Sequence, residues 1–255
     1  MGLRPPTRRQ AAAYNFRLKG REAFLIEHRG QLVQSHFGRY LREAFGDRPW
    51  SMLDVGGASG DLCDYLHEDF PHLRATVLDI SPDLLNANVR APWKTIVEGS
   101  ATELVSCLGQ QSFDLICIHN LLHHVVDGKY HSSGRQVERV LQQARELLAP
   151  NGRLSLFEMS YRGWPIETLC GRIIFELTSN RVIGPLCRPF GANTGGVGVR
   201  FQPESAWRDM LARSGFDILE FVRAAAFRFP LYVRVPLAMR IAEPVHFWCS
   251  GQGSR

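Results

Sequence analysis

Residues 53–61 read L-D-V-G-G-A-S-G-D, and this segment gives the strongest indication of the fold. A short apolar run ends at Val55, a glycine-rich turn follows, and helix-like sequence begins after the turn. Glycine lets a backbone approach a ligand closely and adopt torsion angles that other residues avoid. The turn also directs backbone N–H groups toward a bound molecule. The pattern therefore predicts a strand–turn–helix unit that binds a ligand.

Asp79 is the second informative residue, because it closes the next apolar run 19 residues after Gly60. A carboxylate at the end of a second strand can accept hydrogen bonds from both ribose hydroxyls of a nucleoside. A dinucleotide-binding turn reads G-x-G-x-x-G, whereas the third position from Gly56 is Ala58 and the sixth is Asp61. Asp61 would place a negative charge where a pyrophosphate must bind. The pattern favours a nucleoside ligand without a phosphate.

These residues resemble the class I S-adenosylmethionine (SAM)-dependent methyltransferases, whose pattern is D-x-G-x-G-x-G followed by an acid after the second strand. The matching positions are Asp54, Gly56, Ala58 and Gly60, and then Asp79. Ala58 departs from the family's middle glycine and narrows the space near the methionine part of the cofactor. The resemblance covers residues 50–160 and the end of the sheet, and it implies SAM as the cofactor.

The resemblance extends to segments that follow other predicted strands. Residues 79–82 are similar to the family's segment after the second strand, and residues 99–101 lie where the family often has G-D-A. Ser100 replaces the acid that faces the adenine amine, so adenine recognition would use backbone groups. The cofactor-binding residues implied by the resemblance are Asp54, Gly56, Gly57, Ala58, Gly60, Asp79, Ile80, Ser100, Ala101, His119 and Asn120.

Short apolar runs alternate with helix-like stretches along most of the chain. Strands are predicted at residues 51–55, 74–79, 95–97, 114–119, 153–158, 216–223 and 245–249. Helices are predicted at residues 60–70, 82–90, 132–148, 166–179 and 203–214. This alternation predicts an α/β fold with a parallel sheet. The resemblance implies a Rossmann-like, doubly wound, seven-stranded and mostly parallel sheet whose last strand is antiparallel.

The two ends of this pattern divide the chain. Residues 7–46 carry helical periodicity, so we predict an N-terminal helical segment at residues 1–48. The methyltransferase domain is predicted at residues 49–255. The strand–helix alternation stops at about residues 160–200, which we interpret as a cap insertion over the substrate pocket.

Four polar residues lie at or just after the end of the predicted fourth strand, at the edge where open parallel sheets bind ligands. His119 and Asn120 are expected at the methionine half of the cofactor, and His123 and His124 nearer the acceptor. Methyl transfer needs a base only if the acceptor holds a proton, and deprotonating a phenol at pH 7 costs roughly 4 kcal/mol. The candidate bases are His124, His123 and Glu158, with His124 slightly favoured. The alternative for both histidines is that they order the loop.

Metal and disulfide chemistry have little support in the sequence. The spacing His119-x-x-x-His123 would stack two imidazoles on one helix face, but no third ligand is evident apart from His131 and Asp127. The six cysteines contain no C-x-x-C pair, and most fall in apolar runs. We therefore predict no metal site and a reducing compartment.

Charge and hydropathy exclude some locations. The formal net charge of +5 is a mild excess that suits a solvated surface as well as an anionic ligand. The first residues are polar and basic, unlike a signal peptide, and no apolar run approaches the length of a membrane span. The chain is predicted to be cytoplasmic.

The predicted function is methylation of a small-molecule acceptor, a secondary metabolite or a related metabolite, with oxygen or nitrogen as the favoured atom. A lipid or quinone methyltransferase is an alternative of the same kind. An RNA methyltransferase is a less favoured alternative, suggested by the basic N-terminus. No nucleic acid is expected, because residues 119–122 lack the N/D-P-P-Y/F motif and no Lys/Arg-rich run interleaves with aromatics. A non-catalytic SAM-binding protein is supported only by Ala58 and Ser100.

Residues 224–243 alternate apolar side chains with arginines. Arginine stems can lie along an apolar surface while their charged groups stay in water. Pro230 and Pro236 argue against one continuous amphipathic helix. Membrane contact, a homodimer interface and simple cap packing are equally open interpretations of this segment.

Overall fold

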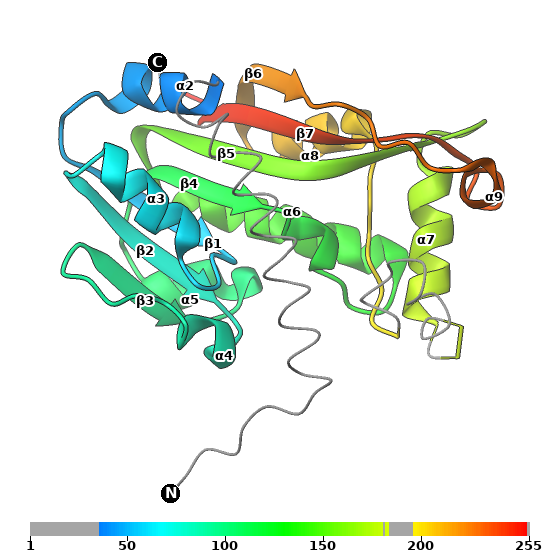
Figure 1. Cartoon of the computed structure of the whole chain (residues 1–255), viewed down its shortest axis with the longest axis horizontal. Coiled ribbons are helices and arrows are strands. Elements are labelled where there is room, and N and C mark those ends of the chain that lie inside the picture. Colours follow the sequence, from blue (N-terminus) through cyan, green and yellow to red (C-terminus); the bar gives the residue numbers. More distant parts are fainter. Residues whose placement is uncertain (1–35, 181, 184–195, 254–255) are drawn as a thin grey trace, which may run out of the picture. The chain divides into compact units, whose positions relative to one another are not determined.

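The computed structural model describes residues 36–180, 182–183 and 196–253 (Figure 1). The chain divides into two compact units, residues 1–49 and residues 50–255. The helix described in the first unit is α2, His36–Phe45, in which Arg39 and Glu43 pair one turn apart at 3.8 Å. The remainder of the helical region predicted at residues 7–46 lies outside the described residues.

The second unit contains a seven-stranded sheet in the order β3-β2-β1-β4-β5-β7-β6 (Figure 1). Its strands are β1 Trp50–Val55, β2 Leu73–Asp79, β3 Lys94–Glu98, β4 Phe113–His119, β5 Leu148–Gly163, β6 Phe216–Arg223 and β7 Met239–Gly251. The strands β1 to β5 pair in parallel, and β7 is antiparallel to both β5 and β6. This arrangement confirms the predicted fold class, including its antiparallel last strand.

Helices cover both faces of this sheet (Figure 1). They are α3 Asp61–Asp69, α4 Pro82–Leu85, α5 Leu104–Leu108, α6 Tyr130–Glu146, α7 Leu169–Ser179, α8 Glu204–Arg213 and α9 Leu231–Arg234. Leu104, Leu141 and Trp207, from α5, α6 and α8, belong to one hydrophobic core with the strands. Among the described residues, no helix is long and apolar enough to cross a membrane.

The centre of the sheet explains where a ligand can bind. Residues 115–118 of β4 are fully buried, as expected for a strand covered on both faces. The chain order of the strands reverses between β1 and β4, which lie side by side. The loops after these two strands diverge at the carboxyl ends, and such a switch point leaves a crevice.

Strands β5 and β7 are longer than predicted. The sequence predicted residues 153–158 and 245–249, but the two strands pair from Arg153 opposite Ser250 to Gly163 opposite Met239. The extra length could not be predicted from local sequence, because each strand supplies the hydrogen-bond partners that keep the other extended. The predicted cap therefore begins inside β5, and most of its Gly/Pro-rich part lies outside the described residues.

Two short helices also differ from the prediction. The helix expected at residues 82–90 ends after one turn at Leu85, and turns carry the chain on to Asn88. The helix α5 was not predicted, since its five residues are too few to show a periodic pattern. The early end of α4 matters for the site, because it brings the Asn88 side chain beneath the loop after β1.

Candidate cofactor and acceptor site

The loop between β1 and α3 is tightly packed. Gly56 and Gly60 have φ angles of 73° and 74°, in the left-handed region that favours glycine. A Cβ atom on Gly57 would lie 2.6 Å from Asp54 Oδ2, and a Cβ atom on Gly60 would lie 2.6 Å from the side-chain amide of Asn88. Packing beneath the loop therefore requires these glycines.

Ala58 stands at the middle of this loop, where the family pattern has glycine. Its φ angle is 48°, and its side chain is buried. Its N–H donates to Asp79 Oδ2 at 3.0 Å, and its carbonyl accepts from Asn88 Nδ2 at 3.2 Å. These two hydrogen bonds hold a non-glycine residue in a conformation that costs roughly 1–2 kcal/mol.

Asp79 ends β2 with its carboxylate fixed by the backbone. Oδ2 accepts from Ala58 N–H, and Oδ1 accepts from the Ser81 N–H at 2.9 Å. The residue is buried, yet it lines a cavity. Each carboxylate oxygen can accept more than one hydrogen bond, so the group retains acceptor capacity toward that cavity.

The cavity measures about 440 Å³ and is formed by the carboxyl ends of several strands. It is lined by Gly56, Leu78, Asp79, Ile80, Gly99, Ser100, Ala101, Thr102, Leu121, His124, Val125, Val126, Asp127 and Gln136. Six predicted site residues are thus brought together at one cavity: Gly56, Asp79, Ile80, Ser100, Ala101 and His124. The Ser100 hydroxyl accepts from the Thr102 N–H at 3.2 Å and caps the short helix Ala101–Glu103.

The other predicted cofactor residues lie beside the cavity rather than in its lining. Asp54 is buried beneath the loop, near Gly57. His119 Nε2 lies 2.8 Å from Ser155 Oγ, which is also 2.8 Å from His246 Nε2. Asn120 follows β4 with a φ of 51°, and its Oδ1 is buried without a hydrogen-bond partner in the described part of the chain. Direct cofactor contact by these residues stays a prediction.

His123 and Glu158 form a buried pair. Glu158 Oε2 lies 2.6 Å from His123 Nδ1, and Oε1 accepts from the Leu122 N–H at 2.6 Å. Glu158 is fully buried, and neither member of the pair lines the cavity. Glu158 therefore ties the interior of β5 to the turn Leu122–His124 that follows β4.

His124 differs from His123 in its surroundings. It lies in the same short helical turn, but it lines the cavity that also contains Asp79. The spacing of His119 and His123 does not place the two imidazoles on one helix face, because His119 ends a strand and His123 lies in this turn. The described residues contain no group of three or more His, Cys, Asp or Glu side chains that could hold a metal ion.

The side chains that pack around His123 were not predicted from the sequence. The Phe201 ring stacks on the His123 ring at 4.9 Å and on the Tyr161 ring at 4.1 Å. Burial raises the pKa of Tyr161 to about 12, so its phenol keeps its proton at neutral pH. Arg200 lies over the Tyr130 ring at 4.6 Å, and burial lowers the pKa of its guanidinium. These residues come from distant segments, and no local pattern links them.

Comparisons with known proteins identify the domain. Residues 53–154 match the family model of a methyltransferase domain. The chain is 26% identical over 128 residues to norreticuline-7-O-methyltransferase of Papaver somniferum, covering 50% of this chain and 32% of that enzyme. It is 28% identical over 186 residues to a ubiquinone/menaquinone biosynthesis C-methyltransferase of Bradyrhizobium diazoefficiens, covering 67% of each. The solved structure of the YcgJ protein from Bacillus subtilis superposes with a TM-score of 0.56 at 14% identity, covering 84% of this chain and 97% of that one.

The matched residues include the loop after β1, Asp79 and the turn into β5. Residues 53–154 thus match a methyltransferase domain, and the fold is that of the class I SAM-dependent methyltransferases. The cofactor of the chain is SAM. The chain spans about a third of the length of the poppy enzyme, so that enzyme's acceptor is not carried over by this match.

Replacing Ala58 with glycine tests the strain in the loop. We expect Ala58→Gly to raise the free energy of unfolding by about 1 kcal/mol, because glycine adopts a positive φ without steric cost. Urea denaturation measures this change. Ala87→Gly, at an exposed position in the turn after α4, serves as the control and should not stabilise the protein. A loss of stability in Ala58→Gly would contradict the strained conformation.

Removing Glu158 tests its structural role. Glu158→Ala leaves the buried Leu122 N–H and the His123 imidazole without their acceptor, so we expect a loss of about 3 kcal/mol or more in the free energy of unfolding. Glu158→Gln keeps one acceptor oxygen and should lose about 1–2 kcal/mol. Glu98→Ala, at the exposed end of β3, should change stability by less than about 0.5 kcal/mol. Equal stability of Glu158→Ala and the wild type would rule out this role.

Proposed function

We propose that this enzyme transfers the methyl group of SAM to an oxygen or nitrogen atom of a small-molecule acceptor. One observation carries the proposal: a single cavity is lined both by Asp79, the predicted ribose-binding carboxylate, and by His124, a predicted base. Similarity to an O-methyltransferase of small-molecule metabolism agrees with this acceptor class. Neither the acceptor itself nor the atom methylated follows from that similarity.

The cavity residues fit SAM by their chemistry. The Asp79 carboxylate is held by two backbone N–H groups and can accept hydrogen bonds from ribose hydroxyls. Ile80 is 71% exposed at the cavity and offers an apolar surface to the adenine. The buried Oδ1 of Asn120 can accept from the amino group of the methionine part. When bound, SAM supplies a methyl group on a positively charged sulfur.

His124 is proposed as the general base. An imidazole at the cavity wall can take the proton from an acceptor hydroxyl or amine as the new bond to the methyl carbon forms. Such a contribution is worth typically 10²–10⁴-fold in rate. Methyl transfer requires the nucleophile, the methyl carbon and the sulfur in line. The residues that line the cavity would therefore also raise the rate by aligning the acceptor.

His123 and Glu158 are proposed as positioning residues rather than bases. Their mutual contact at 2.6 Å occupies the His123 Nδ1, and both side chains are buried outside the cavity lining. The Glu158 contact with the Leu122 N–H fixes the turn that carries His124. The pair thereby holds the proposed base in place.

Carbon methylation of a quinone or another lipid is the second candidate. The similarity to a quinone-pathway C-methyltransferase extends over 67% of both chains, further than the similarity to the O-methyltransferase. A C-methyltransferase also needs a base when the attacking carbon must lose a proton. The same cavity and His124 would therefore serve this reaction.

Cofactor binding is tested first by calorimetric titration with SAM. We expect Asp79→Ala to weaken SAM binding by about tenfold or more, since a hydrogen bond to a charged group contributes roughly 1.5–3 kcal/mol. Asp83→Ala, an exposed carboxylate in α4, is the control and should bind SAM normally. Thermal unfolding of both variants checks that they are folded. Unchanged SAM affinity in folded Asp79→Ala would refute the assignment of this cavity.

The role of His124 is tested by its pH dependence. With a phenolic acceptor found by screening, His124→Ala should lower kcat by about 10²–10⁴-fold at pH 7. The deficit should shrink as the pH approaches about 10, where a phenol ionises without help. The exposed His131→Ala is the matched control and should keep the wild-type profile. A deficit that is the same at every pH would show that His124 acts only by packing.

A further inference from the structure

The segment between β6 and β7 has an inner and an outer side. On the inner side, Phe229 and Leu237 pack against a small core that contains Cys170, Met239 and Ala242. The backbone is also tied to β7, because the Phe227 N–H donates to the Ala242 carbonyl at 2.8 Å. The segment is therefore fixed on the sheet, and its outward side chains form a defined surface.

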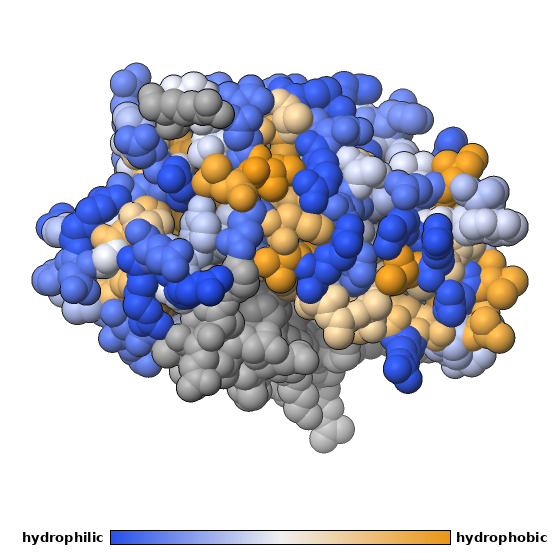
Figure 2. Space-filling view, turned by 90° about the horizontal axis from the view of Figure 1, so that it is seen from above, coloured by the Kyte–Doolittle hydropathy of each residue, from blue (hydrophilic) through white to orange (hydrophobic). Residues whose placement is uncertain are grey.

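The outer side is strongly apolar. Leu231, Tyr232 and Val235, in and after α9, are 71%, 74% and 73% exposed. Trp164 is 69% exposed and lies next to this segment, since its N–H donates to the Ala238 carbonyl at 2.9 Å. Figure 2 shows hydrophobic side chains exposed at its right-hand end, the end at which Figure 1 shows α9. We call Trp164, Phe227, Leu231, Tyr232 and Val235 the α9 surface.

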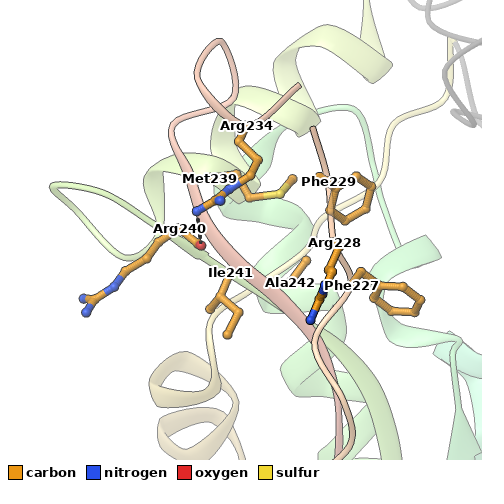
Figure 3. A pocket seen from close by; sticks show the side chains of 8 residues that line it. All are labelled: Phe227, Arg228, Phe229, Arg234, Met239, Arg240, Ile241 and Ala242. Carbon is orange, nitrogen blue, oxygen red and sulfur yellow. Dashed lines mark hydrogen bonds between the residues drawn. The ribbon is translucent and has the colours of Figure 1, made fainter. Parts of the chain in front are cut away.

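Three arginines accompany the α9 surface. Arg228, Arg234 and Arg240 line a cavity of about 310 Å³ together with Phe227 and other apolar residues (Figure 3). Arg234 Nη2 donates to the carbonyl of Arg240 at 3.0 Å, as Figure 3 shows. Within the described part of the chain, none of these arginines forms an ion pair.

Arginines on the neighbouring strands, in contrast, do form ion pairs. Arg162 pairs with Glu243 at 3.5 Å, and Arg223 pairs with Glu204. Carboxylates thus neutralise these two arginines on β5 and β6, while the three arginines beside the α9 surface keep their positive charges. Large exposed apolar side chains beside uncompensated cations are unusual on a surface that faces only water.

We propose that the α9 surface docks this enzyme on a membrane that contains anionic phospholipids. A bilayer interface offers apolar acyl chains beside phosphate groups, and this matches both features of the surface. Tyr and Trp side chains are favoured at that interface, and the planar guanidinium binds phosphate oxygens in pairs. Arginine stems can lie along the apolar region while their charged groups reach the phosphates.

The arginines set the expected size of the effect. Each basic residue near an anionic membrane contributes about fivefold in affinity. Replacing all three should weaken binding on the order of a hundredfold. Added salt should weaken the binding of the wild-type protein, because it screens the attraction between exposed charges.

Vesicle co-sedimentation of the full chain tests the proposal. The probes are vesicles of pure phosphatidylcholine and vesicles of an equimolar mixture of phosphatidylcholine and phosphatidylglycerol. One variant combines Arg228→Ala, Arg234→Ala and Arg240→Ala. A matched control with the same charge change replaces three exposed arginines elsewhere in the chain: Arg74, Arg90 and Arg135. A second test variant, Leu231→Ser with Val235→Ser, removes apolar contacts and keeps every charge.

The proposal predicts salt-sensitive binding to the mixed vesicles and little binding to pure phosphatidylcholine. The first variant should lose binding on the order of a hundredfold, the second should also weaken, and the control should bind within a fewfold of the wild type. Equal losses in the arginine variant and its control would overturn the proposal, since net charge alone would explain the binding. Absence of binding to both vesicles would also overturn it. So would a dimer in sedimentation velocity that the Leu231 and Val235 changes dissociate, because a second copy would then cover the surface.

Discussion

The hydrogen bond from the Ala58 N–H to the Asp79 carboxylate joins the two halves of the proposed cofactor site. It links the loop after β1 to the end of β2, at the point where the strand order leaves a crevice. Without it, the left-handed conformation of Ala58 would have only the Asn88 contact to hold it. The same bond orients the carboxylate that faces the cavity, so loop shape and ligand chemistry depend on one interaction.

A second constraint acts on the other wall of the cavity. The fully buried Glu158 joins the interior of β5 to the turn after β4 through Leu122 and His123. Leaving any member of such a buried polar group without its partner is costly, which makes the turn rigid. The two adjacent histidines therefore have different surroundings: His123 is held inside the protein, and His124 lines the cavity.

The features that could be predicted from the sequence are those set by residues close together along the chain. The glycine-rich loop and Asp79 could be predicted because the strand, the turn and the acid lie in one short span. The alternation of strands and helices predicts the parallel sheet. The pairing of His123 with Glu158 joins residues 35 positions apart, and a sequence pattern does not show which buried groups meet. Asn88 is missed for a related reason, because its place beneath the loop depends on α4 ending after one turn.

The direction of β5 determines at which edge of the sheet the α9 surface lies. This strand runs parallel to β1 and β4, so its carboxyl end points to the same edge of the sheet as the loops around the cavity. Its extension to Gly163, paired with Met239, carries the segment with α9 beyond that edge. A membrane bound by the α9 surface would consequently lie on the side of the sheet from which ligands enter. An apolar acceptor that partitions into the bilayer could then reach the cavity without crossing bulk water. Membrane docking at this surface would therefore suit a quinone-type acceptor.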